Sequence, residues 1–204
     1  MNHLVIGTHN QGKAKEIKEY LFHLLLEEKF NISSLIDLKV NYVVEENGDS
    51  FFQNALLKSK QYSELLQLPV LSDDGGLVIP YLNNEPGVKS KRWAGYEMSD
   101  EELIEYTLKK MHKAEGKERK AYLTTTLVFY DSHRDLILFS EAKTEGEIAK
   151  QPSQKMIKGY PFRSLFIVSK FKKYYVDLDI DEHKQINHRY FALKKIVRQI
   201  LKHY

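Results

Sequence analysis

The pattern of hydrophobic and polar positions along the chain predicts helices and strands that alternate. Short apolar runs, several of them β-branched, predict buried strands at residues 4–6, 69–71, 77–79 and 165–168. Apolar residues that recur at three- and four-residue spacing predict helices over residues 13–28, 51–66, 99–111 and 186–204. Ser50 and Ser99 stand where the N-caps of two of these helices belong, which sharpens their predicted starts.

Three further stretches predict extended structure. Residues 31–44 predict two short strands with a turn between them. Residues 121–130 and 136–144 are rich in β-branched and aromatic side chains and predict a long antiparallel pair. Helices that alternate with strands, plus one antiparallel pair, are typical of an α/β fold with a mixed sheet.

Composition narrows the class of protein. A chain of 204 residues with 42% hydrophobic content fits one domain, residues 1–204, with one buried core. The absence of cysteine excludes disulfides and thiolate metal sites. No apolar run suits a membrane span or an export signal, so we expect a cytoplasmic protein with no membrane partner. A net charge of +3 suits a small polyanion at least as well as nucleic acid, and we expect no nucleic-acid partner.

The first candidate site is the loop Thr8–Lys13 between a predicted strand and a predicted helix. A helix N-terminus carries unpaired N–H groups and a partial positive charge, which suit a phosphate, and Lys13 can add a full charge. An ordinary tight turn with a solvated lysine explains the segment equally well. Gly7–Lys13 also fits the P-loop pattern G-x-x-x-x-G-K, but Ala14 replaces the Ser or Thr that binds magnesium. A P-loop-type NTPase that releases orthophosphate therefore stays open as an alternative.

Two acidic pairs form the second candidate site. Glu45-Glu46 precedes Asn47-Gly48, and Asp73-Asp74 precedes Gly75-Gly76, each after an apolar stretch. Carboxylates at strand ends of an α/β sheet lie where ligands usually bind, and strand neighbours point to opposite faces. We therefore expect one member of each pair to face the site. Each pair alone could be a solvated strand terminus, but two pairs beside a phosphate loop favour a site for a hard divalent cation.

Five segments in order along the chain resemble the inosine triphosphate pyrophosphatase family. The family patterns are T-x-N-x-G-K, E-E-x-G-x-S-F-x-x-N-A, D-D-S-G-L, P-G-V-x-S-A-R-x-A-G and S-H-R-x-x-A-L. The matching residues are Thr8-His9-Asn10-Gln11-Gly12-Lys13, Glu45-Glu46-Asn47-Gly48 with Ser50-Phe51 and Asn54-Ala55, Leu71-Ser72-Asp73-Asp74-Gly75-Gly76-Leu77, Pro86-Gly87-Val88 with Ser90, Arg92 and Ala94-Gly95, and Asn187-His188-Arg189 with Ala192-Leu193. Together they span residues 4–193 and are far more specific than any one of them.

The resemblance implies an α/β fold with an elongated mixed β-sheet flanked by helices, and a homodimer. It implies magnesium-dependent hydrolysis of deaminated purine nucleoside triphosphates, such as ITP, dITP and XTP, to the monophosphate and pyrophosphate. Glu46 and Asp74 would bind Mg²⁺, and Asp74 would also activate the attacking water. The residues that would contact phosphate are Thr8, His9, Asn10, Gln11, Gly12, Lys13 and Gly75. The residues that would contact the base are Tyr160, Pro161, Phe162, Arg163, His183, Lys184, His188 and Arg189.

The chain departs from the family mainly at the base end. The family's G-F-G-Y-D-P is here the segment 159–164, in which Arg163 reverses the charge of the aspartate. Arg163 could recognise a different base, bridge to phosphate or face solvent. The family's lysine before S-H-R falls on His183, with Lys184 one position late, and Gly75 replaces a serine. A divergent nucleotide-binding protein without turnover is therefore a second alternative, and the pair His188-Arg189 taken alone would be a helix-surface pair.

Overall fold

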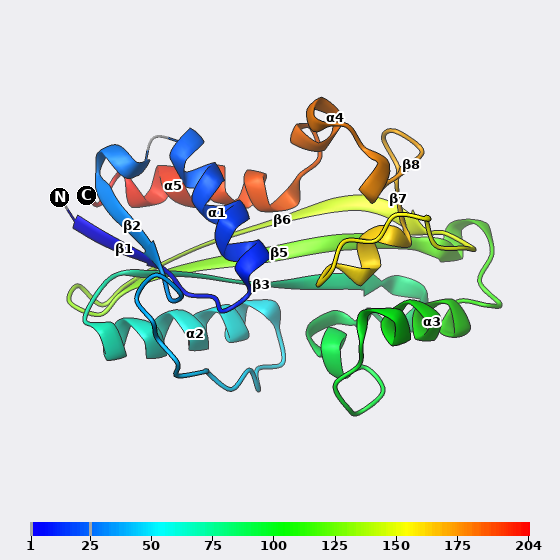
Figure 1. Ribbon diagram of the computed structural model, residues 1–204, viewed down its shortest axis with the longest axis horizontal. Helices are drawn as coiled ribbons and strands as arrows, with labels where there is room; N and C mark the ends of the chain where they lie inside the picture. Colours follow the sequence, from blue (N-terminus) through cyan, green and yellow to red (C-terminus); the bar gives the residue numbers. More distant parts are fainter. Residues whose placement is uncertain (1, 25) are drawn as a thin grey trace. The chain divides into compact units, whose positions relative to one another are not determined.

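The computed structural model describes residues 2–24 and 26–204. Among these residues, eight strands form one mixed sheet in the order β2-β1-β3-β5-β6-β7-β8, with β4 beside β3 (Figure 1). β1 runs parallel to β2 and β3, whereas β4 is antiparallel to β3, and β7 is antiparallel to β6 and β8. The strands are β1 (Asn2–Ile6), β2 (Phe30–Ser34), β3 (Val70–Ile79), β4 (Glu85–Pro86), β5 (Lys120–Asp131), β6 (Leu136–Ile148), β7 (Phe166–Val168) and β8 (Lys173–Tyr174). The predicted mixed α/β fold is confirmed.

The described residues divide into two compact units. The first contains the chain up to Asp74 with Thr125–Ala142 and Arg189–Tyr204, and the second contains Gly75–Thr124 and Lys143–His188. Strands β3, β5 and β6 contribute residues to both units. The single domain over residues 1–204 stays a prediction.

The first unit packs helices on both faces of its strands. Helices α1 (Gln11–His23) and α5 (His188–Ile200) lie on one face, and α2 (Phe51–Leu66) lies on the other (Figure 1). The alternation of side chains along β1 explains this arrangement, because Leu4 and Ile6 join the apolar cluster that includes Ile17 of α1. Val5 instead joins the cluster that includes Tyr62 of α2. The strand is therefore apolar at three consecutive positions, residues 4–6, as a strand covered on both faces must be.

Helix starts in this chain are set by side-chain caps. The Ser50 hydroxyl accepts a hydrogen bond from the Gln53 N–H at 3.2 Å, and α2 has the predicted bounds. Ser99 and Glu102 form a reciprocal capping box at the start of α3 (Asp100–Lys110), which lies in the second unit. Both helices are confirmed because their caps and periodicity are local features of the sequence.

The second unit has its own apolar core. Leu77 and Ile79 of β3, Leu103 and Ile104 of α3, and Phe166 of β7 belong to one buried cluster. The unit also contains the short helix α4 (Ile180–Lys184).

Arg119 is a buried cation of the second unit that hydrogen-bonds to backbone carbonyls. It is 8% exposed and donates hydrogen bonds to the backbone carbonyls of Met111, Ala114, Ile148 and Ala149. Two of these carbonyls follow the end of α3, where a helix leaves carbonyls without partners. The guanidinium therefore donates to four backbone acceptors, of which the Met111 carbonyl also accepts the Ala114 N–H at 3.1 Å.

Several predicted elements differ from the observed ones. The helix predicted over 13–28 ends at His23, and residue 25 lies outside the described residues. The final helix begins at His188 and ends at Ile200 rather than spanning 186–204. The second strand predicted within 31–44 is wrong, because residues 40–50 have no helix or strand. Among the described residues, no helix has the length and apolar run that a bilayer crossing requires.

The acidic pairs were predicted at strand ends, and this prediction is wrong for both. Asp73 and Asp74 lie inside β3, which continues through Gly75 to Ile79 as one strand. The two glycines do not break the strand because β5 lies beside β3 in the sheet. The partner strand β1, however, pairs with β3 only as far as Leu71, so both aspartates lie just beyond its carboxyl end.

Candidate active site

The loop after β1 turns directly into helix α1. The Gly7 N–H donates to the Leu71 carbonyl at 2.8 Å, which holds the loop against β3. A Cβ atom at Gly7 would lie 2.2 Å from the Ser72 hydroxyl, so no larger residue fits there. The Asn10 side chain caps α1 by accepting the Lys13 N–H at 3.0 Å. The predicted phosphate loop is thus a rigid helix N-terminus at the end of a buried strand.

The loop residues differ in exposure. Thr8 is buried, and its hydroxyl accepts the Asn10 N–H at 3.2 Å. Gln11 and Gly12 are exposed, and Lys13 is half-buried. His9 is half-buried, and its Nε2 lies 2.9 Å from the Tyr42 carbonyl oxygen. The loop therefore exposes its backbone and the Lys13 charge to a ligand. The hydrogen bonds of Thr8 and Asn10 hold the loop itself in place.

Glu45 and Glu46 lie in the irregular segment 40–50, which is held on α2. The Val44 N–H donates to the Tyr62 hydroxyl at 3.3 Å, and the Gly48 N–H donates to the Asn54 side chain at 2.8 Å. A Cβ atom at Gly48 would lie 2.8 Å from that same Asn54 oxygen, so the segment needs glycine to approach the helix. Side-chain contacts with α2, rather than strand pairing, thus position Glu46.

Glu46, Lys58 and Asp74 form a charged group of the first unit. Lys58 Nζ lies 2.9 Å from Glu46 Oε2, and Asp74 Oδ2 accepts a hydrogen bond from Asn54 at 3.0 Å. Burial, together with the charge of Glu46, raises the pKa of Asp74 although Lys58 and Lys13 act against it. Burial lowers the pKa of Lys58, but Asp74 and Glu46 outweigh it and leave that pKa raised. The Lys58 ammonium therefore interacts electrostatically with two carboxylates, those of Glu46 and Asp74.

This donor set fits a magnesium ion that arrives with its substrate. Within the described part of the chain, no three histidine or acidic side chains gather as a metal cage would need. Magnesium is usually held by one or two carboxylates plus substrate phosphates and waters. Asp74 and Glu46 supply two such carboxylates, and burial raises the pKa of the Asp74 carboxyl.

Asp73 belongs to a second charged group on the other side of β3. Its carboxylate is fully buried, with Lys13 Nζ at 3.2 Å and Arg189 Nη2 at 3.3 Å. The second Arg189 Nη contacts Glu16 Oε2 at 2.5 Å. Burial alone would raise the pKa of Asp73, but Lys13, Arg189 and Lys58 hold it well below its usual range. Asp73 thus faces α1 and α5, whereas Asp74 faces α2, as the alternation of strand side chains predicts.

The interpretation of His188-Arg189 as a helix-surface pair is wrong. Both residues are buried, at 5% and 4% exposure. His188 Nδ1 lies 3.2 Å from the Thr144 hydroxyl within the second unit. Arg189, in the first unit, is held by Glu16 and Asp73. A base contact by either residue stays a prediction.

The segment 159–164 and α4 belong to the second unit. Several of the predicted base residues there contact one another through aromatic rings. The Arg163 guanidinium lies 3.9 Å from the Tyr160 ring centroid and 5.0 Å from the Tyr175 centroid. The His183 ring contacts Tyr175 at 5.0 Å, edge to face. Tyr175 therefore connects residues that the sequence named separately.

Two predicted base residues are placed differently from this cluster. Phe162 is part of the apolar core of the second unit, next to the buried Pro161. Lys184 is exposed, and its ammonium pairs with Asp181 at 3.4 Å. Gly75, which was predicted to contact phosphate rather than base, is half-buried within β3.

Three residues of these groups were not singled out from the sequence: Glu16, Lys58 and Tyr175. Asn54 and Asp73 were named only as members of motifs, without a role of their own. A signal existed for Asn54 and Lys58, because they lie one helical turn apart on the face of α2 that also buries Ala55. A lysine on a buried helix face is rare unless it is paired. Nothing local in the sequence marks Tyr175, or Glu16, whose partner Arg189 is 173 positions away along the chain.

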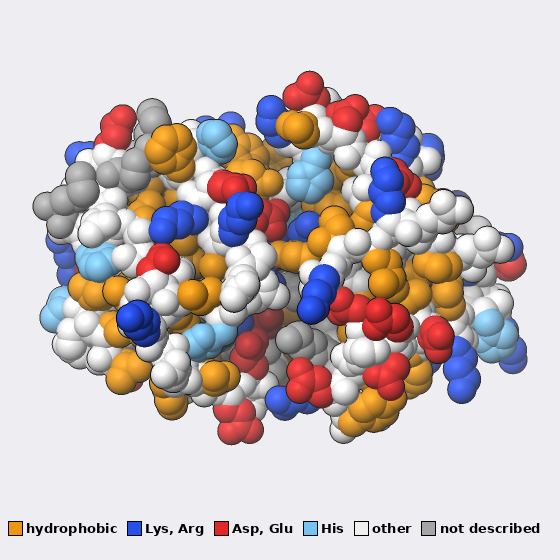
Figure 2. Space-filling model, in the orientation of Figure 1, with side chains coloured by type: hydrophobic (Ala, Val, Ile, Leu, Met, Phe, Trp, Pro, Cys, Tyr) orange, Lys and Arg blue, Asp and Glu red, His pale blue; other side chains and the backbone are white. Residues whose placement is uncertain are grey.

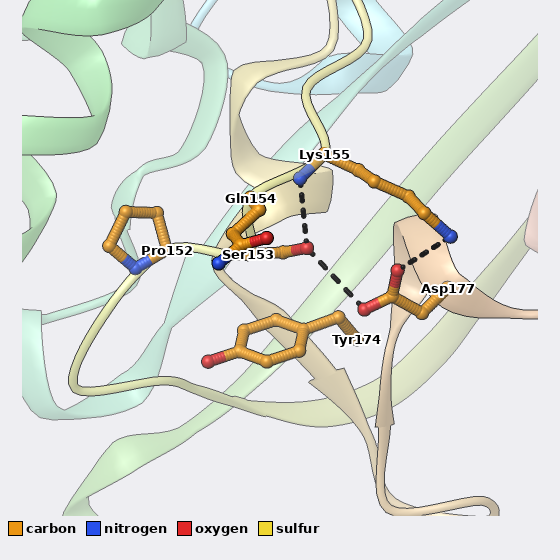
Figure 3. Close-up of a pocket in the computed structure, with 6 residues that line it drawn as sticks. All are labelled: Pro152, Ser153, Gln154, Lys155, Tyr174 and Asp177. Carbon is orange, nitrogen blue, oxygen red and sulfur yellow. Dashed lines mark hydrogen bonds and ion pairs between the residues drawn. The ribbon is translucent and has the colours of Figure 1, made fainter.

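A hollow elsewhere in the second unit contains none of these residues. It has a volume of about 340 Å³ and is lined by Pro152, Ser153, Gln154, Lys155, Tyr174 and Asp177 (Figure 3). Lys155 and Asp177 form an ion pair across it at 3.1 Å. Basic and acidic side chains are also interspersed over the face shown in Figure 2. Neither feature competes with the charged groups at β3 as a site for a polyphosphate.

Comparisons with known proteins agree with the motifs. A family model described as the Ham1 family matches residues 4–199. The chain is 34% identical over 199 residues to a dITP/XTP pyrophosphatase of Thermoanaerobacter sp., covering 98% of this chain and 96% of the relative. It is 33% identical over 196 residues to the dITP/XTP pyrophosphatase of Bacillus subtilis, covering 96% of each.

Solved structures show the same fold. A HAM1 protein from Coxiella burnetii superimposes with a TM-score of 0.83 at 28% identity, covering all of both chains. The Staphylococcus aureus Ham1 protein gives a TM-score of 0.82 at 29% identity, covering 98% of each chain. The resemblance to inosine triphosphate pyrophosphatases is confirmed, and the chain belongs to the Ham1 family.

Proposed function

We propose that the protein hydrolyses deaminated purine nucleoside triphosphates, such as ITP, dITP and XTP, to the monophosphate and pyrophosphate. The observation that carries the proposal is the pair of charged groups at β3. Lys13 stands at the start of α1, and Glu46, Lys58 and Asp74 lie together beside the same strand. Relatives named dITP/XTP pyrophosphatase over nearly the whole chain support the same activity.

The loop residues and the charged residues of the first unit each have a role in this proposal. The triphosphate lies at the N-terminus of α1 and takes the Lys13 charge, with Thr8, Asn10 and the backbone of Gln11-Gly12 around it. Glu46 and Asp74 would hold Mg²⁺, which when bound would supply positive charge to the phosphate oxygens. Asp73 fixes Lys13 from the buried side.

Asp74 is the proposed proton acceptor. Water adds its oxygen to a phosphorus atom, the bond between the α- and β-phosphates breaks, and the water proton passes to an Asp74 oxygen. The hydrogen bond from Asn54 orients this carboxylate, and Lys58 keeps Glu46 beside it.

The residues around Tyr175 are the proposed base contacts. Donors such as His188 suit the 6-oxo group of hypoxanthine or xanthine, whereas adenine presents an amino donor at that position. The resemblance also implies a homodimer. A cytoplasmic location, where nucleotide substrates are available, is proposed as well. Light scattering on the purified protein tests the dimer, because a monomeric mass contradicts it.

The P-loop alternative is not favoured. It requires a hydroxyl directly after Lys13, and Ala14 is instead a buried apolar residue of α1. The two enzyme mechanisms also differ in product, since a P-loop NTPase releases orthophosphate.

A substrate panel tests the function. ITP, dITP, XTP and the four standard triphosphates are incubated with the protein and Mg²⁺, and pyrophosphate is measured against orthophosphate. We expect pyrophosphate from the deaminated purines, and a loss on the order of 100-fold or more in Asp74→Asn. Lys60→Met, a charge change elsewhere on α2, serves as the control. Nucleotide binding without any product contradicts the proposal and favours the binding protein without turnover.

A further inference from the structure

The histidine of the phosphate loop makes contacts that reach away from the N-terminus of α1. The His9 Nε2 atom lies 2.9 Å from the Tyr42 carbonyl oxygen, 33 positions along the chain. The His9 ring also meets the Tyr62 ring of α2 edge to face, with the centroids 5.9 Å apart. All three residues belong to the first unit. His9 therefore joins the loop after β1 both to the segment 40–50 and to α2.

The direction of this hydrogen bond decides which nitrogen of His9 carries a hydrogen. A carbonyl oxygen only accepts, so the Nε2 atom must be the donor. A neutral imidazole has one N–H group and one acceptor nitrogen, and here the N–H group is already used by Tyr42. The Nδ1 atom that remains is an acceptor and would repel a phosphate oxygen. The neutral ring therefore suits an anchor better than the phosphate contact predicted for His9.

The segment that His9 contacts carries Glu46, one of the two proposed metal ligands. Val44, two residues before Glu46, packs in the same apolar cluster as Tyr62. The Val44 N–H donates to the Tyr62 hydroxyl at 3.3 Å. Tyr62 thus contacts both the His9 ring and the backbone just before Glu46. The phosphate loop and the segment with Glu46 are therefore connected in two ways, directly and through Tyr62.

The segment 40–50 has few other restraints. It contains no helix or strand, so no ladder of backbone hydrogen bonds fixes it. Residues 41–43 and 45–47 are exposed, so burial holds the segment mainly at Val44. Where a segment has few buried contacts, local opening is easy, and each hydrogen bond accounts for a large share of the restraint.

We propose that His9 is a positioning residue for the metal site, which holds the segment 40–50 against the phosphate loop so that Glu46 can reach an ion that accompanies the triphosphate. This inference rests on the proposed function, in which Glu46 and Asp74 bind Mg²⁺. The role requires a donor at the place of Nε2 and no positive charge. Loss of that donor should weaken the use of Mg²⁺ and leave the binding of metal-free nucleotide unchanged.

Two substitutions of His9 separate the roles of its two nitrogens. The side-chain amide of glutamine reaches about as far as Nε2, whereas the shorter amide of asparagine reaches about as far as Nδ1. His9→Gln should therefore keep the hydrogen bond to Tyr42, and His9→Asn should lose it. In His9→Asn we expect the Mg²⁺ concentration for half-maximal pyrophosphate release from ITP to rise about three- to tenfold, as one hydrogen bond contributes. His9→Gln should stay within about twofold of the natural protein.

His3→Asn is the matched control, because it removes a similar contact elsewhere in the first unit. The His3 Nε2 atom lies 2.9 Å from the Ser33 hydroxyl, between β1 and β2. This variant should keep the natural Mg²⁺ requirement, and thermal melting checks that each variant folds. Calorimetry of ITP binding in EDTA tests the alternative, a contact between a charged His9 and phosphate. Weaker binding of ITP in EDTA to both His9→Gln and His9→Asn would overturn the inference.

Two measurements without nucleotide distinguish failure of this inference from failure of the proposed function. Hydrogen exchange of the peptide 40–50 should be faster in His9→Asn than in His9→Gln or the natural protein. The rise of Tm with Mg²⁺ should need about three- to tenfold more ion in His9→Asn. Both results without any pyrophosphate release support the positioning role and contradict the proposed turnover. Natural exchange or a natural Mg²⁺ requirement in His9→Asn, or a His9→Gln protein as impaired as His9→Asn, overturns the inference and leaves the proposed function standing.

Discussion

Lys58 can be replaced by methionine to test whether the β3 site is built for a cation. The Lys58 side chain is 9% exposed, and its Nζ lies 2.9 Å from Glu46 Oε2. Its charge also acts on Asp74 and Asp73. Methionine has a similar length and can fill the same space without charge. The variant therefore removes the ammonium that acts on both Glu46 and Asp74.

The cost follows from the exposure of the two carboxylates. A hydrogen bond to a charged group contributes about 1.5–3 kcal/mol, and a fully buried ion pair that loses one partner costs about 3–5 kcal/mol. Water can replace Lys58 at Glu46, whose side chain is 43% exposed, but much less at Asp74, which is 9% exposed. We expect a loss of about 2 kcal/mol, which for a chain of 204 residues lowers Tm by about 4–8 °C.

Thermal unfolding with and without Mg²⁺ is the assay. In EDTA, Lys58→Met should melt about 4–8 °C below the natural protein. Added Mg²⁺ should raise the Tm of the variant more than that of the natural protein, because the ion no longer competes with the lysine. If the variant binds Mg²⁺ about tenfold more tightly, the difference is about 1.4 kcal/mol, or about 3–6 °C.

The control is Lys60→Met, two residues along the same helix, whose ammonium lies over the Tyr130 ring at 5.4 Å. It should lose less stability and gain no more from Mg²⁺ than the natural protein does. An equal Mg²⁺ gain in Lys58→Met and the natural protein would refute the idea that Glu46 and Asp74 form the metal site. An unchanged Tm in EDTA would refute the role assigned to Lys58.

Three further variants test the packing around the site. The folded pKa of Asp73 is lowered below its ordinary 3.8, so its charge stabilises the fold above that range and this stability is lost as pH falls below it. Asp73→Asn should therefore be less stable at pH 7 and show a flatter urea midpoint from pH 6 to pH 3. Gly7→Ala should cost about 1–3 kcal/mol in urea unfolding, since its Cβ would meet Ser72. Arg119→Met should lose about 3 kcal/mol, or about 6–12 °C in Tm, because four carbonyls lose their donor.

Each of these predictions has a contrary outcome. An Asp73→Asn protein with the same acid dependence as the natural protein would show that Asp73 is not the buried charge described. A Gly7→Ala protein of natural stability would contradict the close approach of Gly7 to Ser72 of β3. Arg119→Lys cannot reach four carbonyls with one ammonium, so full stability in that variant would contradict the role of the guanidinium.

Local features explain why much of the fold could be predicted. Helices α2 and α3 were placed correctly because their caps, Ser50 and Ser99, and their apolar periodicity lie within a few residues of each other. β5 and β6 were predicted because a long β-branched and aromatic run has few alternatives. The segment 40–50 was mispredicted because its apolar residues have no strand partner and instead rest on α2 through Val44 and Tyr62.

The sequence by itself therefore determined the family, the phosphate loop and the two acidic pairs, since these are short motifs in a fixed order. Only the tertiary structure decided what the motif residues contact. It placed Asp73 and Asp74 on opposite sides of β3, and it joined Arg189 to Glu16, 173 positions away along the chain. Such pairs depend on which helix covers which face of the sheet. Local periodicity does not encode which helix covers which face. A charge is buried only where a partner of opposite sign is available, and here that partner is distant along the chain.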